Sequence, residues 1–369
     1  MYTIINEGNA ELKIAVAGKI SKEMPVFYNP VMKLNRDISV LLLNSVDKKG
    51  LQIADPLAGT GVRSIRFLLE LKKNKIKAIS INDYSKEAVR LIKENLKLNK
   101  IKLNNKIIIK NEDANIFLLS STGFDYIDID PFGSPNFMLD SAVKRLARDG
   151  ILAVTATDTA PLCGTYPTAC LRKYWAIPLR NELMHEIGLR ILIKKIQLIG
   201  AQYEKALTPI FSYYKYHYFR VFLRCEKGKK DVDKVIEQHG MFENAGPLWL
   251  GPLFDKLLVK KINKMSEMLC ISEHTQKSLI FDDSSIIKKM GDKELVKLLS
   301  IIKNESKINT IGFYDIHEIC KKYKIKQIPK KESIIKKIKK SGYKAAETHF
   351  NPNGIRSDIP SNKLLRIIQ

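Results

Sequence analysis

The segment 128–135, with the sequence DIDPFGSP, has the residue types needed to grip a flat base that carries an exocyclic amine. It follows the apolar run 124–127, so it should lie at the end of a strand. Asp130 can accept one hydrogen bond from such an amine, and the carbonyl of Pro131 can accept a second. Phe132 can stack on the face of the ring. The same residue types form ordinary turns, so this segment alone leaves both interpretations open.

A second loop, 55–63 with the sequence DPLAGTGVR, has the composition of a nucleotide-binding loop. It precedes an expected helix over 61–73, at the edge where open α/β sheets bind ligands. Gly59 and Gly61 permit close backbone approach, but residue 64 is serine where a dinucleotide fingerprint has its third glycine. NAD and FAD are therefore disfavoured. S-adenosylmethionine has no phosphate to hold, so this looser loop is sufficient for it.

Acidic residues follow the next two expected strands. Asp83 comes about 20 residues after the glycines, where a carboxylate can bind ribose hydroxyls. Asp113 can accept a hydrogen bond from an adenine amino group, and the amide of Ala114 can donate to the ring. Each acid taken singly is more often a helix cap or turn residue. Acids in register after successive strands, with Asp130 after the fourth, indicate a methyltransferase of the Rossmann-like class.

The elements that must position these loops can be predicted from hydrophobic periodicity. Residues 51–160 alternate apolar runs of strand length with amphipathic stretches of helix length, which predicts βαβ units on a doubly wound parallel sheet. The expected strands are 51–54, 78–81, 106–110, 124–129, 150–155 and a late strand over 213–224. The expected helices are 61–73, 86–99 with Ser85 as N-cap, and 137–147.

The second half of the chain has a different pattern. The polar stretch 226–230 predicts a domain boundary near residue 228. Helical patterns dominate beyond it, at 253–269, 293–303 and 333–340. We therefore expect two domains, 1–228 with an N-terminal extension over 1–35, and 229–369.

The bulk composition narrows the class of protein. Of the 369 residues 45% are apolar, no run is long enough to span a membrane, and no export signal is visible, so we expect a cytoplasmic protein without a membrane partner. The five cysteines are widely spaced without a C-x-x-C pair, which argues against zinc and disulfides. The net charge of +24 indicates a polyanionic partner, with nucleic acid the leading candidate. Lys-Ile-rich composition alone can also make a chain basic.

Short motifs along most of the chain, from near residue 5 to near residue 358, carry a family resemblance. They are VFYNPVM (26–32), NRD (35–37), GTGVR (59–63), DPFGSP (130–135), TATD (155–158), PLCG (161–164), GPLWLGP (246–252), FYD (313–315) and THFNPNG (348–354). Together they resemble the tRNA (guanine-26, N2) dimethyltransferases of archaea and eukaryotes.

The resemblance implies a role for individual residues. The residues that it places against the methyl donor S-adenosyl-L-methionine are Arg36, Arg63, Asp83, Asp113 and Ala114. The catalytic loop that it implies consists of Asp130, Pro131, Phe132 and Gly133, with Phe27 clamping the target base against Phe132. It also implies a Rossmann-like class I methyltransferase sheet with a smaller α+β C-terminal domain that holds tRNA. No metal is expected, because the cysteine-rich zinc site of some members is missing, and we expect a monomer.

The expected reaction is the transfer of one or two methyl groups to N2 of guanine 26 in tRNA. Gly133 and Ser134 are small enough to leave room for a first methyl group. Two alternatives remain at this point. The first is an exocyclic amino-methyltransferase that acts on another base or nucleic acid, and the second is a non-catalytic RNA-binding protein that retains the fold.

Overall fold

A computed structural model describes residues 2–15, 26–274 and 293–369, with the side chains of 269–274 outside the description. Within these residues, the main sheet has seven strands in the order β5-β4-β3-β6-β7-β9-β8. They are β3 (Leu51–Asp55), β4 (Ile76–Asn82), β5 (Ile107–Lys110), β6 (Phe124–Ile129), β7 (Leu146–Ala156), β8 (Lys205–Lys215) and β9 (Tyr218–Lys227). β3 to β7 pair in parallel, whereas β9 runs antiparallel to both its neighbours. The expected α/β sheet is confirmed.

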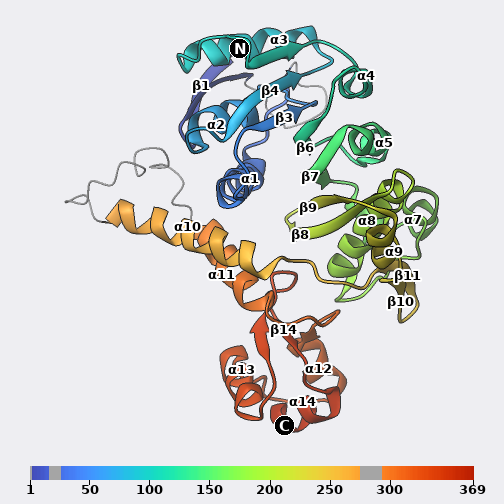
Figure 1. Ribbon diagram of the computed structural model, residues 1–369. Coiled ribbons are helices and arrows are strands. Elements are labelled where there is room, and N and C mark those ends of the chain that lie inside the picture. Colours follow the sequence, from blue (N-terminus) through green and yellow to red (C-terminus); the bar gives the residue numbers. More distant parts are fainter. Residues whose placement is uncertain (1, 16–25, 275–292) are drawn as a thin grey trace.

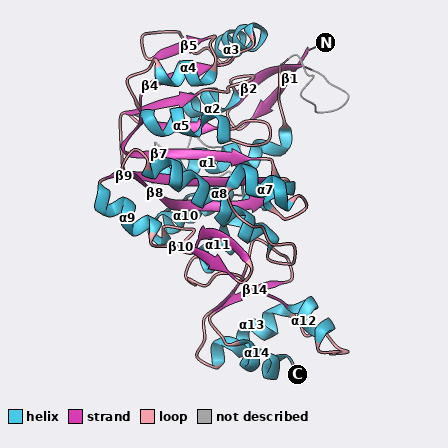
Figure 2. Cartoon of the chain, turned by 90° about the vertical axis from the view of Figure 1, so that its right-hand side faces the viewer, coloured by secondary structure: helices cyan, strands magenta, loops and turns pink. Residues whose placement is uncertain are grey.

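Helices cover both faces of this sheet (Figures 1 and 2). The helices that share a core with one face are α1 (Lys33–Ser45), α2 (Val62–Glu70), α3 (Lys86–Leu98), α10 (Lys256–His274) and α11 (Lys293–Glu305). Those on the other face are α4 (Ala114–Leu119), α5 (Asn136–Arg145), α6 (Thr159–Leu162), α7 (Pro167–Tyr174), α8 (Met184–Ala201) and α9 (Lys229–Ile236). Strand β7 shows why both faces are apolar. Leu152 and Val154 enter one core and Ile151 and Ala153 the other, as the period of two requires.

Two sequence predictions differ from the structure in detail. The expected helix 61–73 ends at Glu70, and the single late strand over 213–224 is wrong, because β8 and β9 form a hairpin there. The hairpin turn contains Tyr216, whose φ is +52°. Turns of this kind are usually marked by glycine or asparagine. The run of aromatic residues therefore gave no sign of the turn.

The N-terminal hairpin of β1 (Tyr2–Glu7) and β2 (Ala10–Ala15) packs beside α3. The side chain of Asn95 accepts a hydrogen bond from the amide of Lys13 at 2.7 Å and donates to its carbonyl at 3.1 Å. Asn99 makes the equivalent pair with Glu11. These contacts fix the hairpin and so place Glu7 near the functional site. Residues 16–25 of the expected N-terminal extension lie outside the described residues.

After α9 the chain forms the hairpin β10 (His239–Phe242) and β11 (Ala245–Trp249), which packs on α8. A second, small sheet has the order β12-β14-β13. Its elements are β12 (Tyr314–Asp315), β13 (Ala345–Glu347), β14 (Gly354–Ser357), α12 (Ile316–Lys322), α13 (Lys331–Lys340) and α14 (Ser361–Ile368). This α+β unit, red in Figure 1, has a core of its own.

The packing favours a domain boundary near residue 314 rather than near 228. Trp249 and Leu299 belong to the two cores of the large sheet, whereas Ile316 and Ile368 belong to the third core. The polar stretch 226–230 is the end of β9 and the start of α9, not a linker. We therefore propose that the C-terminal domain begins near residue 314.

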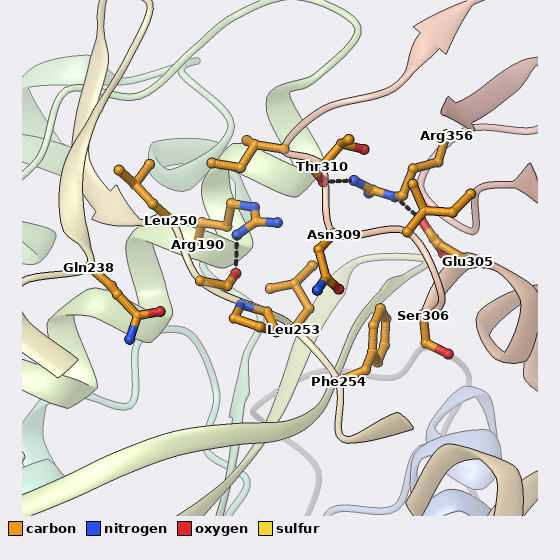
Figure 3. A pocket seen from close by; sticks show the side chains of 14 residues that line it. Arg190, Gln238, Leu250, Leu253, Phe254, Glu305, Ser306, Asn309, Thr310 and Arg356 are labelled. Carbon is orange, nitrogen blue, oxygen red and sulfur yellow. Dashed lines mark hydrogen bonds and ion pairs between the residues drawn. The ribbon is translucent and has the colours of Figure 1, made fainter. Parts of the chain in front are cut away.

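A buried ion cluster joins β14 to α8 and α11, and Figure 3 shows three of its members, Arg190, Glu305 and Arg356. Arg356 of β14 binds Glu186 of α8 at 2.6 Å and Glu305 of α11 at 2.9 Å. Arg190 is paired with Glu186 at 2.9 Å and lines, with Arg356 and Glu305, a pocket of about 270 Å³. The charges in this cluster are mutually compensated, so it is built to hold the two parts together. In the part of the chain that is described, no helix is long and apolar enough to cross a membrane.

Candidate functional site

A cavity of about 770 Å³ opens at the carboxyl ends of β3, β4 and β6. The predicted site residues that line it are Phe27, Arg36, Arg63, Asp83, Asp130, Pro131 and Phe132. Those outside its lining are Asp113, Ala114 and Gly133. The tertiary structure thus brings the glycine loop and the Asp130 loop, which are about 70 residues apart in the chain, to one cavity.

The glycine loop and Asp83 form one wall of the cavity. The Asp83 carboxylate accepts hydrogen bonds from the amides of Gly59 at 2.8 Å and Ser85 at 2.9 Å. Burial raises the pKa of Asp83 despite these bonds. An added Cβ at Gly59 would come within 2.9 Å of the Phe27 carbonyl oxygen, so this glycine is required for the loop to pack. A carboxylate fixed in this way can bind hydroxyl groups of a ligand.

Asp113 and Ala114 lie at the neighbouring strand end. Asp113 is the N-cap of α4 and accepts from the amides of Asn115 at 2.8 Å and Ile116 at 3.2 Å. The Asn82 side chain ties this loop to β4 through both the amide and the carbonyl of Glu112, at 3.0 Å each. A contact of Asp113 or Ala114 with the cofactor therefore stays a prediction.

Arg36 is already paired with a carboxylate that sequence reasoning missed. Its guanidinium forms a bidentate pair with Glu7, at 2.7 and 2.6 Å. Burial by itself would raise the pKa of Glu7, but Arg36 and Arg66 outweigh burial and lower that pKa to about 2. Glu7 lies on the N-terminal hairpin, 29 residues from Arg36, and no motif connects the two. The contact of Arg36 with the methyl donor stays a prediction.

Arg63 holds the carboxylate of Asp130. Its Nη2 donates to Asp130 Oδ2, while Nη1 contacts Asn35 Oδ1 at 3.1 Å, Ser39 Oγ at 3.1 Å and Asp128 Oδ2 at 3.3 Å. Arg63 is only 4% exposed. One end of the guanidinium is therefore fixed by α1 and β6, and the other end orients Asp130. The second carboxylate oxygen of Asp130 can then accept a hydrogen bond from an amine.

A buried arginine of β9, Arg220, holds the Asp128 carboxylate that contacts Arg63. Arg220 binds both oxygens of Asp128, at 3.0 and 2.7 Å, and the Tyr126 hydroxyl donates to Asp128 at 2.6 Å. Burial would raise the pKa of Asp128, but the attraction of Arg220 and Arg63 lowers it. The result is an alternating chain of charges, Arg220, Asp128, Arg63 and Asp130. The sequence gives no sign of it, because Arg220 is 92 residues from Asp128.

Two aromatic rings meet at the cavity. The centroids of Phe27 and Phe132 are 4.3 Å apart, with the rings at 73° to each other. The expected pair is thus present in edge-to-face contact. A base held between two rings needs them roughly 7 Å apart, two contact layers of about 3.5 Å. The rings must therefore separate if they are to clamp a base, and Phe132, which is 43% exposed, offers one face for stacking.

The loop after Phe132 is anchored to the end of β7. The Gly133 amide donates to Thr157 Oγ1 at 2.7 Å, and the Thr157 amide donates to the Gly133 carbonyl at 3.0 Å. An added Cβ at Gly133 would meet no atom within 4 Å, which is compatible with space for a methyl group. Its φ of +77° would nevertheless strain any larger residue at this position.

Asp55, Thr157 and His217 also line the cavity and were not predicted as site residues. Asp55 is the last residue of β3, is 3% exposed, and accepts from Ser64 Oγ at 2.7 Å. Burial raises the pKa of Asp55 to about 7, against the attraction of Arg63. His217 lies in the unpredicted β8–β9 turn. Asp55 had a sequence signal as the first residue of the glycine loop and Thr157 as part of the TATD motif (155–158), whereas His217 had none.

We expect Asp55 to make the stability of the protein fall as pH rises from about 4 to 7. The folded protein keeps a proton on Asp55 up to about pH 7, whereas the unfolded chain releases it near 3.8, so deprotonation favours unfolding in this window. Asp55→Asn should remove this part of the pH dependence. The measurement is the free energy of urea unfolding at several pH values, with the exposed Asp233→Asn as control. A variant with the wild-type pH profile would contradict the assignment.

Within the described ranges, no group of three or more His, Cys, Asp or Glu residues could hold a metal ion. The described cysteines Cys163, Cys170, Cys225 and Cys320 are free and buried. The side chain of Cys270 lies outside the description.

Comparison with known proteins identifies the family. A family model described as N2,N2-dimethylguanosine tRNA methyltransferase matches residues 6–245 and 239–369. The chain belongs to this family. The resemblance inferred from the sequence motifs is thereby confirmed.

Relatives match over nearly their whole length. The tRNA (guanine(26)-N(2))-dimethyltransferase of Pyrococcus horikoshii is 39% identical, covering 99% of this chain and 97% of that protein. The tRNA (guanine(26)-N(2)/guanine(27)-N(2))-dimethyltransferase of Aquifex aeolicus is 37% identical, covering 98% and 95%. The solved structure of Trm1 from P. horikoshii with S-adenosyl-L-methionine has a TM-score of 0.85, 38% identity, and full coverage of both chains. The expected methyltransferase fold with a C-terminal domain is confirmed.

Proposed function

We infer that this protein transfers methyl groups from S-adenosyl-L-methionine to the exocyclic N2 of guanine 26 in tRNA. Relatives named for that activity match the chain over nearly its whole length. The observation in this structure that carries the inference is a single cavity that joins the glycine loop and Asp83 to the Asp130, Pro131 and Phe132 loop. A methyl donor bound at the glycine loop and Asp83 would face a base bound at the loop of Asp130, Pro131 and Phe132.

The donor occupies the wall formed by Gly59, Thr60 and Asp83. In this proposal the Asp83 carboxylate binds the ribose hydroxyls, and Asp113 and Ala114 bind the adenine edge from the next strand end. Gly61 has a φ of +77°, which supports the tight turn before α2. Arg36 completes the donor site from α1.

The acceptor amine is oriented by Asp130 and the Pro131 carbonyl. The lone pair of guanine N2 is delocalised into the ring, so the amine is a poor nucleophile. When Asp130 and the Pro131 carbonyl accept hydrogen bonds from the two N–H groups of the amine, they favour a pyramidal nitrogen. Its lone pair then points at the sulfonium methyl group, with the reacting atoms about 3 to 3.5 Å apart. As the S–CH3 bond breaks and the N–CH3 bond forms, positive charge passes from sulfur to nitrogen, and the Asp130 carboxylate stabilises that charge. The methylated nitrogen then loses one proton, which Asp130 can accept and pass to solvent.

Arg63 acts on this step by fixing Asp130. Its pairing with Asp130 Oδ2 fixes the carboxylate and leaves the other oxygen for the amine. This role is additional to the donor contact that the family resemblance implies. Arg63 can serve both because it lines the cavity and is held at its other end by Asn35, Ser39 and Asp128.

The target guanine must leave its stack to reach the cavity, at a cost of a few kcal/mol. Stacking on Phe132 and Phe27 offsets part of this cost, since a base–aromatic stack contributes about 1 to 3 kcal/mol. The net charge of +24 and the lysines of the C-terminal domain support tRNA as the partner. A monomer in the cytoplasm remains our prediction for the state of the enzyme.

The test is methylation of unmodified tRNA transcripts with labelled S-adenosyl-L-methionine, followed by nucleoside analysis. We expect label only in N2-methylguanosine and N2,N2-dimethylguanosine, and we expect it to disappear when guanine 26 is replaced by adenine. A transcript with guanine 27 replaced is the matched control, because the Aquifex relative is named for both positions. Label on another base would contradict the assignment and favour the alternative amino-methyltransferase.

A further inference from the structure

A group of large apolar side chains is exposed on and beside α7. The exposed fractions are 59% for Tyr166, 55% for Leu171, 45% for Trp175 and 51% for Ile177. Arg172, Lys173 and Arg180 are exposed between them. We call the segment 165–180 the α7 rim. Single exposed apolar residues are ordinary, but four within one short segment, interleaved with basic residues, indicate an interaction surface.

The α7 rim is hydrogen-bonded to residues that directly follow the catalytic loop. Asn136, which follows that loop, donates to the carbonyl of Lys173 at 2.8 Å. The Tyr174 hydroxyl bonds to Ser134 Oγ and to Asp158 Oδ2, at 3.1 Å each. Lys173 pairs with the same Asp158 oxygen at 2.9 Å. A molecule bound at the rim would therefore lie next to the base that the loop presents.

Exposed aromatic rings continue from the rim to the cavity. Phe132 and Phe137 line the cavity and are 43% and 56% exposed. Bases that are splayed out of a helix bind to such aromatic platforms by stacking. A tRNA whose guanine has left its stack exposes the faces of the neighbouring bases, so these rings match the chemistry of the substrate.

Trp175 is held in place from beneath. The Lys195 ammonium of α8 lies 2.8 Å from the centroid of the Trp175 ring, and Lys194 donates to the Trp175 carbonyl at 2.7 Å. Its backbone has a φ of +56°, which turns the chain at the end of α7. These contacts order the ring by covering one of its faces while Trp175 stays 45% exposed, so little conformational freedom is lost when a base stacks on it.

The charges around the rim favour a polyanion. Arg172 and Arg180 are exposed, and Lys194 and Lys195 lie beneath Trp175. The acidic side chains nearby are Asp158, which is paired with Lys173 and Tyr174, and Glu182. Basic groups therefore outnumber acidic ones at this surface, which suits phosphate groups.

We propose that the α7 rim binds the tRNA nucleotides that flank the target guanine. Their bases stack on Trp175 and Tyr166, and their phosphates contact Arg172 and Arg180. The proposal rests on the proposed function and extends it, because it assigns tRNA contacts to the methyltransferase domain in addition to the basic C-terminal domain. The rim and the catalytic loop then act on neighbouring nucleotides.

The test compares full-length variants for tRNA affinity and methylation. Trp175→Ala and Tyr166→Ala should each raise the Kd and KM for tRNA by about 5- to 100-fold. The Kd for S-adenosyl-L-methionine and kcat at saturating tRNA should stay within about twofold, which a general loss of folding would not allow. Trp175→Phe should restore most of the affinity. Arg172→Gln should lower the slope of log Kd against log salt by about 1.

The control variants are Leu103→Ala, at a side chain 57% exposed beyond α3, and Lys102→Gln beside it, neither of which should change tRNA binding. The proposal is overturned if Trp175→Ala and Tyr166→Ala both bind tRNA like the wild type, since the rim would then serve another partner. A wild-type protein that neither binds nor methylates tRNA would overturn the proposed function itself. The two failures are therefore distinguishable.

Discussion

Replacing Asp130 by asparagine should lower kcat by about 100- to 1,000-fold, the size of effect seen when one preorganised group that stabilises a developing charge is removed. The asparagine keeps the shape of the side chain but loses the negative charge. Only one of its two terminal atoms is an acceptor, and the other presents an NH2 group to the amine or to Arg63. Affinity for S-adenosyl-L-methionine should change by less than about threefold, because Asp83 and the glycine loop form the other wall of the cavity.

The measurement is single-turnover methylation at saturating tRNA, together with calorimetric titration of S-adenosyl-L-methionine. The exposed Asp149→Asn is the matched control and should behave like the wild type. Arg63→Met tests the orientation of Asp130, and it should lower kcat as well, because the Asp130 carboxylate loses its anchor. If Asp130→Asn weakens donor binding as much as it lowers kcat, Asp130 belongs to the donor site and the proposed role is wrong.

Arg356→Met should destabilise the protein by about 3 to 5 kcal/mol. Arg356 is 2% exposed and compensates Glu186 and Glu305, both of which are buried. Figure 3 shows its pair with Glu305. Methionine fills much of the space but removes the arginine that pairs with Glu305, which keeps hydrogen bonds to Thr348 and His349. Because this cluster joins β14 to α8 and α11, the C-terminal domain should unfold separately from the large sheet.

Urea unfolding, followed by both fluorescence and circular dichroism, measures this effect. The matched control is Lys331→Met, which removes the partly exposed pair with Glu347 and should cost less than about 1 kcal/mol. The pKa of Glu305 is lowered to about 2 by His349 and Arg356 against the effect of burial. Its contribution to stability is therefore present above about pH 4.5 and lost as pH falls toward 2. A change of less than 1 kcal/mol in Arg356→Met would contradict the role of the cluster.

The sequence predicted the features that depend on local patterns. Apolar runs with strand and helix periods located the elements of the sheet from β3 to β7, because parallel strands are buried on both faces. The rule that parallel sheets bind ligands at the carboxyl edge placed Asp83 and Asp130 at one cavity. The β8–β9 turn was missed, since it has neither the glycine nor the proline that marks such points.

By itself, the sequence determined the family, the methyltransferase fold and the two loops that face each other across the cavity. Only the tertiary structure decided what holds the functional groups. Asp130 is anchored by Arg63, Arg63 shares Asp128 with Arg220, and Arg36 is paired with Glu7. These pairs join residues from 29 to 92 positions apart. A buried charge must find a partner wherever the fold brings one, so its identity depends on packing in three dimensions and not on spacing along the chain.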